Sequence, residues 1–400
     1  MPKLNVKVDT FDDSSLFAHK TIQLGSKSIE TPAKALQIDE TTQTDQVLDD
    51  ARGANEIYVS TNPGKLSKAQ EEFKPNIKKN IGRALNKAND DEFNFVFAQF
   101  GSERRFEDDN LDFLVDTIYS TSDFVTVPLM SDLVSAIEDD GSGASSIYFK
   151  TYRENVKRFI ETAEQISSKP IMGTLPQLPW GLTNKIVELY LDKGIRAFCF
   201  DFNGRTVTAQ FQLSNMVVPL LREIGRRKLQ EEVFFYCLNA NRGRSSNDAN
   251  FVPARDFISL GFGFDLVGDK HMSLPLPADF YDKMGDSDPE IRLFDKDGYY
   301  YQNHEYDGDL TDQLPTETGL DRDRIASNPS DHHRSKFEKL LNGEQQALEA
   351  TDLRPAIDEY RVLDHIEPKA GVDNTVLSNL QSSKQEFDDG RKQKRLNDLW

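Results

Sequence analysis

The chain has 400 residues and a formal net charge of −19, with 48 Lys and Arg against 67 Asp and Glu. This charge argues against a large basic surface for nucleic acid, although a local patch is enough for phosphate contacts. No stretch reaches the roughly 18 apolar residues of a membrane span, and the N-terminus has no apolar signal region, so we expect a cytoplasmic protein. The two cysteines, Cys199 and Cys237, lie inside apolar runs and are predicted to be buried.

Seven short apolar runs recur between residues 55 and 270, and helical patterns separate most of them. The clearest helical pattern covers Tyr152–Ser167. Strands that alternate with helices are typical of a parallel β/α fold. We therefore predict an α/β protein, specifically a (β/α)8 barrel of TIM type, in which the chemistry takes place where the strands end. The predicted strands cover residues 56–61, 95–100, 124–128, 170–174, 197–203, 233–239 and 264–269.

Composition divides the chain into four parts. Residues 1–50 predict a short β-rich lead-in, and residues 51–285 predict the barrel. Residues 286–370 predict an extension, which begins as an irregular region with one small hairpin and continues as a helix at about 332–350. Residues 371–400 are polar and charged, which favours a loosely held tail.

Three aspartates at predicted strand ends are candidate catalytic residues, namely Asp201, Asp265 and Asp269. An aspartate inside an apolar run costs free energy to bury unless it is hydrogen-bonded or used in catalysis. Two carboxylates that face one cavity can act as a nucleophile and as an acid or base, which suits cleavage of a glycosidic or N-glycosidic bond. The alternative is that each aspartate only orders a loop.

Amides and arginines at the same ends are candidate binding residues. Amide and hydroxyl groups could present hydrogen-bonding edges to a planar base, although turns are also rich in Asn and Gly; these candidates are Gln99, Thr174, Gln177, Asn203, Asn239 and Asn241. Arginines that immediately follow strand ends could bind phosphates; these are Arg104, Arg105, Arg242 and Arg244. No Cys-x-Cys or Cys-x-x-Cys pattern occurs, which excludes a zinc site built from thiolates, and no cofactor or metal is predicted.

Three segments together resemble the tRNA-guanine transglycosylase superfamily, over about residues 20–350. Residues 20–32, which end in Thr31-Pro32, look like the opening of these enzymes. Residues 259–269 resemble the family segment Gly-x-Asp-(Leu/Met)-Phe-Asp. Residues 291–299 and the helix after them are similar to the stretch that follows the barrel in archaeal members. The resemblance implies a TIM-type barrel that exchanges guanine for a 7-deazaguanine base in nucleic acid.

The family's nucleophile is the second Asp of the late segment, which attacks the anomeric carbon of the ribose. Carried over, the first Asp of that segment matches Asp265. The second falls on Gly268 without a gap or on Asp269 with one inserted residue, and we assign it to Asp269. The family's acid–base motif, Asp-Ser-Gly-Gly-Phe-Gln, would correspond to residues 98–102, which contain Gln99 and no Asp.

These departures, together with the missing zinc cysteines, favour the divergent branch that inserts 7-deazaguanine into DNA over the enzymes that act on tRNA. A helper protein for strand opening and a homodimer are compatible with that branch. The alternative is a non-catalytic relative, either a transglycosylase-like subunit or a scaffold that binds nucleic acid. A sugar-processing hydrolase that uses Asp201 and Asp265 is a third hypothesis.

Overall fold

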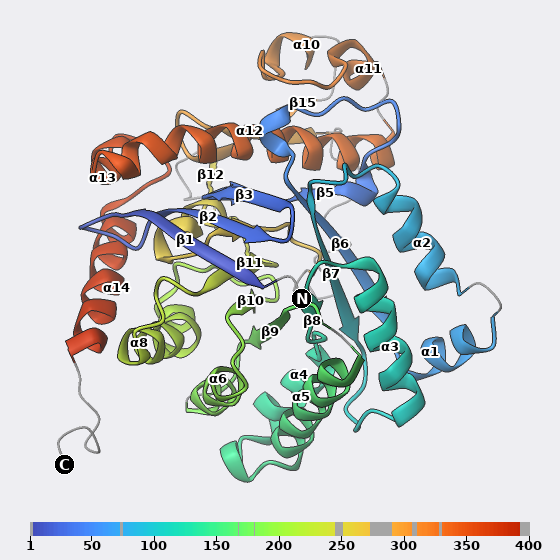
Figure 1. The fold of residues 1–400 in the computed structure, drawn as a ribbon. Coiled ribbons are helices and arrows are strands. Elements are labelled where there is room, and N and C mark those ends of the chain that lie inside the picture. Colours follow the sequence, from blue (N-terminus) through green and yellow to red (C-terminus); the bar gives the residue numbers. More distant parts are fainter. Residues whose placement is uncertain are drawn as a thin grey trace.

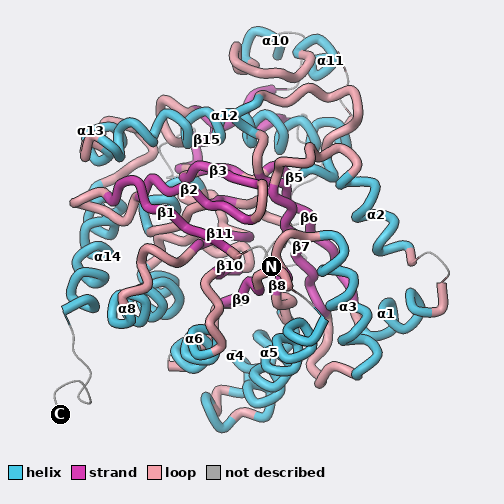
Figure 2. Tube along the Cα trace, viewed as in Figure 1, coloured by secondary structure: helices cyan, strands magenta, loops and turns pink. Residues whose placement is uncertain are grey.

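The computed structural model describes residues 3–72, 75–166, 168–179, 181–244, 251–272, 290–305, 310–327 and 330–392. Parallel strands lie in the middle of the molecule, and helices α2, α3, α5, α6 and α8 lie around them (Figures 1 and 2). Each of the seven predicted apolar runs overlaps a strand, so this part of the secondary-structure prediction is confirmed.

The protein is a mixed α/β structure with a parallel sheet of six strands in the order β4-β13-β11-β10-β9-β8. Every neighbouring pair in this sheet is parallel, and helices lie between most of the successive strands along the chain. The strands are β4 (Ala33–Lys34), β8 (Val125–Thr126), β9 (Ile171–Pro176), β10 (Ala197–Asp201), β11 (Phe234–Leu238) and β13 (Leu266–Val267).

A second parallel sheet of three strands contains β5 (Leu36–Gln37), β6 (Ala54–Thr61) and β7 (Phe93–Phe100). Only Ala35 separates β4 from β5, and its amide donates to the carbonyl of Val267 at 2.9 Å. At the other side, the amide of Leu129 donates to the carbonyl of Ala98 at 2.8 Å, and a parallel bridge joins Leu129 to Gln99. Hydrogen bonds therefore link the two parallel sheets at both sides.

Alternate residues of these strands belong to two different apolar clusters. On β7, Phe93, Phe95 and Phe97 belong to a cluster that also contains Tyr236 of β11. Their neighbours face clusters that include the surrounding helices. This alternation follows from the two-residue period of a strand. It places Asp201 on the same face as Ala197 and Cys199, at the carboxyl end of β10.

The helices that follow the strands are amphipathic and bury their apolar side against the sheets. The predicted helix at Tyr152–Ser167 is confirmed by α5, which buries Tyr152, Val156, Phe159 and Ile160. The helices of this part are α1 (Pro63–Gln70), α2 (Asn76–Leu85), α3 (Asp108–Thr121), α4 (Ser131–Asp140), α5 (Ile147–Ile166), α6 (Leu182–Asp192), α7 (Gln210–Gln212) and α8 (Val218–Arg227). A π-helical turn at Leu213–Val217 joins α7 to α8, and short 3₁₀ segments cover Ile38–Glu40, Asp49–Ala51, Gly143–Ser145 and Phe257–Phe262.

The predicted β-rich lead-in is an antiparallel sheet of β1 (Leu4–Phe11), β2 (Ala18–Leu24) and β3 (Lys27–Thr31). The lead-in ends earlier than predicted, because β4 and β5 pair in parallel with β13 and β6. Two short strands inside residues 1–50 are therefore part of the parallel sheets. Each has only two residues, which is too few for the sequence to show the apolar pattern of a strand.

The chain after the last parallel strand forms a hairpin and a long helix. The predicted hairpin is β14 (Glu290–Asp295) with β15 (Tyr300–Glu305), to which β12 (Phe251–Pro253) adds a third strand. The predicted helix is α12 (Asp331–Asp358), which crosses the upper part of Figure 1. The shorter helices are α10 (Leu310–Gln313), α11 (Arg322–Ala326) and α13 (Val362–Ile366). Of the helices in the described ranges, none has the length and apolar character that a bilayer crossing requires.

The prediction of a loosely held tail was wrong for α14 (Asn374–Lys392). Val376, Leu380 and Phe387 are buried at helical spacing, and α14 packs beside α8 (Figure 1). The amide of Asn379 also donates to the carbonyl of Thr208 at 3.2 Å. Three well-spaced apolar side chains are enough to dock this polar helix, and they were hidden by the charged composition around them. Residues 393–400 lie outside the described residues.

Candidate functional site

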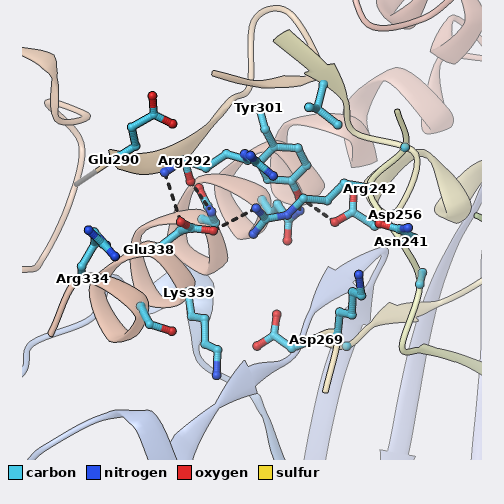
Figure 3. Close-up of a pocket in the computed structure, with 18 residues that line it drawn as sticks. Asn241, Arg242, Asp256, Asp269, Glu290, Arg292, Tyr301, Arg334, Glu338 and Lys339 are labelled. Atoms are coloured by element: carbon cyan, nitrogen blue, oxygen red, sulfur yellow. Dashed lines mark hydrogen bonds and ion pairs between the residues drawn. The ribbon is translucent and has the colours of Figure 1, made fainter. Parts of the chain in front are cut away.

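A cavity of about 500 Å³ lies between the carboxyl ends of β11 and β13 and the helix α12. Figure 3 shows Asp269 at its lower edge, with Arg242, Tyr301 and Glu338 above it. Its walls carry both signs of charge. The residues that line it are Ala240, Asn241, Arg242, Gly243, Val252, Asp256, Gly268, Asp269, Lys270, Glu290, Arg292, Tyr301, Arg334, Ser335, Glu338, Lys339, Asn342 and Gln346. A cavity of this volume is in the range of small-molecule sites.

The predicted catalytic residue Asp269 lies at this cavity, two residues after β13. Its Oδ1 accepts a hydrogen bond at 2.7 Å from Lys34, whose side chain is only 3% exposed. Burial raises the pKa of a carboxyl group, but here the ion pair with Lys34 and the nearby Lys339 outweigh burial, so the pKa of Asp269 is lowered. Asp269 is therefore ionised at neutral pH.

The neighbouring position, Gly268, has no room for a side chain. A Cβ atom there would collide with the Glu56 carboxylate and the Tyr236 ring. The alignment without a gap, which puts the family's nucleophile at residue 268, thus leaves no space for a carboxylate. The alignment with one inserted residue puts it at Asp269, on the cavity.

A buried carboxylate, Glu56, lies directly beneath this strand end, and sequence reasoning did not single it out. Its Oε1 lies 2.6 Å from Nε2 of His271 and accepts from the amide of Asp269 at 2.9 Å. Its Oε2 accepts from the hydroxyl of Tyr236. Tyr58 stacks on the imidazole of His271, with ring centroids 4.4 Å apart and planes 8° from parallel. Burial lowers the pKa of an imidazole, but the Glu56 carboxylate more than offsets it, so the pKa of His271 is raised.

Asp201 lies in the same group of residues and is held by two hydrogen bonds to its Oδ1. The side chain of Asn239 donates at 2.8 Å, and the amide of Asn203 donates at 3.0 Å. Burial raises the pKa of Asp201. Asn239 and Asn203 both have positive φ, 58° and 47°, a conformation that asparagine tolerates better than most residues.

Asn239 connects the three strand ends. Its backbone amide donates to the carbonyl of Asp269 at 3.1 Å, and its side-chain oxygen accepts from the amides of His271 at 2.8 Å and Met272 at 3.1 Å. Together with the bond to Asp201, these contacts bring the ends of β10, β11 and β13 into one network. Four of the predicted candidates, Asp201, Asn203, Asn239 and Asp269, therefore lie together.

Asp265 does not join this group. It precedes β13, whereas Asp269 follows it, so the two side chains lie at opposite ends of the strand. Its Oδ1 forms an ion pair at 2.8 Å with Lys20 of β2, and its Oδ2 accepts from the amide of Phe235 at 2.8 Å. Both side chains of the ion pair are almost fully buried, at 1% and 2% exposure. We therefore assign Asp265 to the packing of the lead-in sheet on the strands, and not to the site with Asp269.

One of the four predicted phosphate-binding arginines, Arg242, differs from the others in its surroundings. Arg242 lines the cavity, stacks over the ring of Tyr301 at 4.2 Å and donates to Glu338 at 2.9 Å, contacts that raise its pKa against the effect of burial. Arg244 is exposed two residues further on. Arg104 and Arg105 are exposed and do not line this cavity, and Arg105 lies 3.7 Å from Glu154.

The remaining predicted base-binding residues also differ in whether they line the cavity. Asn241 lines the cavity (Figure 3), whereas Gln99, Thr174 and Gln177 do not. The Gln99 amide donates to the hydroxyl of Ser131 at 2.9 Å, and the Gln177 carbonyl accepts from Gln212 at 3.0 Å. Thr174 is buried inside β9.

The functional candidates that the sequence did not indicate are Lys34, Glu56, Tyr58 and Lys339. One signal was present for Glu56, which is a lone acidic residue at the start of an apolar strand. Such a residue needs a partner when it is buried, but the sequence does not say which. Within the described ranges, no group of three or more His, Cys, Asp or Glu side chains is arranged to hold a metal ion. A scan against models of known protein families and a search of curated proteins found no match for this chain.

Proposed function

We propose that the parallel strands close into a (β/α)8 barrel of TIM type. The strand pairings support this proposal, because they run from β4 through β13, β11, β10 and β9 to β8 and from β5 through β6 to β7. Leu129 links β7 to the segment after β8, and Ala35 alone separates β4 from β5. In barrels of this type the active site lies at the carboxyl ends of the strands, where Asp201, Asn239 and Asp269 gather.

We further propose that the protein is a transglycosylase that exchanges guanine for a 7-deazaguanine base in nucleic acid. The observation that carries this proposal is Asp269, an ionised carboxylate at a strand end on the wall of a cavity. Attack of its oxygen on C1′ of the nucleotide breaks the bond to the guanine nitrogen and forms a covalent sugar ester. Attack on C1′ by the nitrogen of the incoming base then releases the carboxylate and completes the exchange.

Asp201 and the asparagines around it suit the binding of a base. Oδ1 of Asp201 is occupied by Asn239 and Asn203, and this fixes the direction of the carboxyl group. Its Oδ2 makes no hydrogen bond to the described residues, so it is available to the polar edge of a guanine-type ring. A rigid carboxyl group of raised pKa beside an ionised one divides two roles between two acids.

The basic residues of the cavity suit a phosphate backbone. Arg242, Arg292, Arg334 and Lys339 line it (Figure 3), as does Lys270, and they supply positive charge among the acidic side chains of the cavity in a protein of strongly negative net charge. Phosphate contacts of this kind supply affinity without reading sequence. The loss of the family's zinc cysteines favours DNA over tRNA as the substrate.

The test is the incorporation of a labelled 7-deazaguanine base into single-stranded DNA, duplex DNA and tRNA. Single-stranded DNA avoids the cost of roughly a few kcal/mol for taking a base out of the duplex stack, so incorporation there alone indicates that a helper protein opens the duplex. Asp269→Asn is expected to abolish incorporation. Asp123→Asn is the matched control, because Asp123 forms a Lys27 ion pair of similar length, 2.8 Å, away from the cavity. A folded wild-type protein that modifies none of the three substrates, with any helper added, would contradict the proposal.

One observation favours the alternative of a non-catalytic relative that binds nucleic acid. Gln99 occupies the place of the family's acid–base Asp, and its amide is engaged by Ser131. Under this alternative, single-stranded DNA binds to the wild type and to Asp269→Asn with equal affinity, and neither incorporates the base. Salt-dependent binding measured by fluorescence anisotropy separates the two functions.

A further inference from the structure

His271 and Glu56 form a buried pair beside the proposed nucleophile. The two residues are 215 positions apart in the sequence, and Nε2 of His271 lies 2.6 Å from Oε1 of Glu56. Glu56 is fully buried, and the His271 side chain is 8% exposed. The same Oε1 accepts from the amide of Asp269 at 2.9 Å, so the pair and the nucleophile are joined through one oxygen atom.

The geometry fixes which imidazole nitrogen can exchange a proton. Nε2 is held against the Glu56 carboxylate, so it keeps its hydrogen. Nδ1 makes no hydrogen bond to the described residues, and it is not among the buried polar atoms that lack a partner. Nδ1 is therefore the nitrogen that remains for a hydrogen bond to a ligand, and Tyr58, stacked at 4.4 Å, supports the orientation of the ring.

The charges around His271 favour an imidazole that holds a proton. Four carboxylates act on it and one lysine opposes them. The titratable and charged groups that interact with it are Glu56 and Tyr58 on β6, Asp201 on β10, Asp269 on its own loop, Lys339 on α12 and Asp39 on the 3₁₀ segment at Ile38–Glu40. Since Glu56 has no other cationic side chain in an ion pair within the described ranges, protonated His271 is the group that neutralises it.

We propose that His271 is the acid–base residue of this site and that Glu56 is the residue that positions it. This inference rests on the proposed function. It answers a chemical need, because the departing guanine takes the electron pair of the broken C1′–N bond and requires a proton. The place of the family's acid–base Asp corresponds to Gln99, whose amide is neither an acid nor a base at neutral pH and donates to Ser131.

The proton balance closes within the site. When Asp269 attacks C1′, the guanine nitrogen receives the bond's electron pair, and Nδ1 of His271 gives that base its proton. In the second half, Nδ1 removes the N–H proton of the incoming 7-deazaguanine as this nitrogen attacks C1′ and the Asp269 carboxylate leaves. His271 ends protonated, as it began, and no outside reagent is consumed.

The first test compares His271→Gln with a matched variant, His365→Gln. His365 also lies against a glutamate that accepts from a tyrosine, with 2.7 Å between its Nε2 and Glu349, but it lies in the C-terminal extension. We expect His271→Gln to lower kcat of base exchange by about 10²- to 10⁴-fold and to remove the alkaline limb of the pH profile, with KM for the base changed less than kcat. Glu56→Gln should lower kcat less and shift that limb to lower pH. If His271→Gln exchanges bases like His365→Gln, with the wild-type pH profile, the assignment is overturned while the proposed function stands.

The second test does not require turnover. The chain has six histidines, so His271 can be assigned in the NMR spectrum of the imidazole protons by its loss in His271→Gln. We expect Glu56→Gln to lower the pKa of His271, and binding of free guanine to wild-type protein to shift its signal. If no variant or wild type exchanges bases, the proposed function fails, and a His271 signal that guanine leaves unmoved then overturns the acid–base assignment as well. If guanine does shift the His271 signal in that case, His271 still stands as the group that contacts the base.

Discussion

The carboxylates of Glu56 and Glu349 each accept from a tyrosine hydroxyl and lie against a histidine, yet their charge balance differs. Glu349 accepts from Tyr299 at 2.6 Å and lies 2.7 Å from His365, and Lys369 approaches it at 3.6 Å. Glu349 therefore has a lysine beside it as well as a histidine. His365 is also 30% exposed, so water reaches its ring.

Glu56 lacks such a cation among the described residues, and its histidine is better enclosed. Tyr236, His271 and the amide of Asp269 are its hydrogen-bond donors. Within the described ranges, His271 is thus the one side chain that forms an ion pair with this buried carboxylate, and the carboxylate raises the pKa of His271. The comparison teaches that the same three residue types form a fixed structural contact in one place and a proton-sensitive pair in the other.

The largest expected difference between the two regions is in the cost of removing the carboxylate. Glu56→Ala leaves three donors without an acceptor in a fully buried place, and we expect it to lower the free energy of unfolding by about 3–5 kcal/mol. Glu349→Ala should cost less, because His365 can turn to water. Urea unfolding followed by circular dichroism measures both, and equal losses would remove the distinction drawn between the two carboxylates.

A double-mutant cycle should give a smaller but more specific difference. Between Glu56→Gln and His271→Gln we expect a coupling of roughly 1–3 kcal/mol, since the residues touch and are buried. Between Glu349→Gln and His365→Gln we expect less than about 1 kcal/mol, because solvent screens the partly exposed imidazole. Unfolding of the single and double variants gives both values, and a stronger coupling at Glu349 would reverse the assignment of the proton-sensitive pair.

The pH dependence of stability should also distinguish the first pair. Because the folded pKa of His271 is raised, its stabilising effect is fully present below the unfolded value of about 6.5 and is lost as pH rises through the folded pKa. We therefore expect the stability advantage of wild type over His271→Gln to shrink between slightly acidic and alkaline pH. Thermal unfolding at a series of pH values provides the measurement. A stability difference between wild type and His271→Gln that grows with pH would contradict the raised pKa of His271.

The smallest expected effect concerns the stacking that holds His271. Tyr58→Leu keeps an apolar side chain but removes the ring that lies 4.4 Å from the imidazole, and it should cost about 0.5–1.5 kcal/mol. It should also reduce base exchange if the ring orientation matters for Nδ1. Parallel unfolding and exchange measurements on this variant test both expectations; unchanged exchange would mean that Glu56 alone orients His271.

Much of the fold followed from local pattern. Apolar runs bounded by polar turns predicted the seven strands, because strand formation and burial both act on consecutive side chains. The helix at Tyr152–Ser167 followed for the same reason. The prediction of a loosely held tail was wrong because the segment contains few apolar residues and its composition is charged. Val376, Leu380 and Phe387 are nevertheless spaced so that they dock α14 on α8.

The site was predicted only in part. Three of the predicted candidates, Asp201, Asn239 and Asp269, lie together because strand ends on one side of a parallel sheet meet. Asp265 and Asp269 looked equivalent in the sequence, but a strand separates them and Lys20 binds only the first. Lys34 lies on β4 and Lys339 lies on α12, and no spacing rule relates either to Asp269.

The sequence by itself determined most of the strands and helices around the site, and that polar residues follow several strands. The tertiary structure alone decided that Glu56 meets His271 across 215 residues. It also decided that residue 268 must be a glycine, because a side chain there would collide with the Glu56 carboxylate. The physical reason is that secondary structure depends on neighbours along the chain. The pairing of buried charges depends instead on which strands become neighbours in the fold. The sequence around one charged residue does not show which distant residue will be its partner.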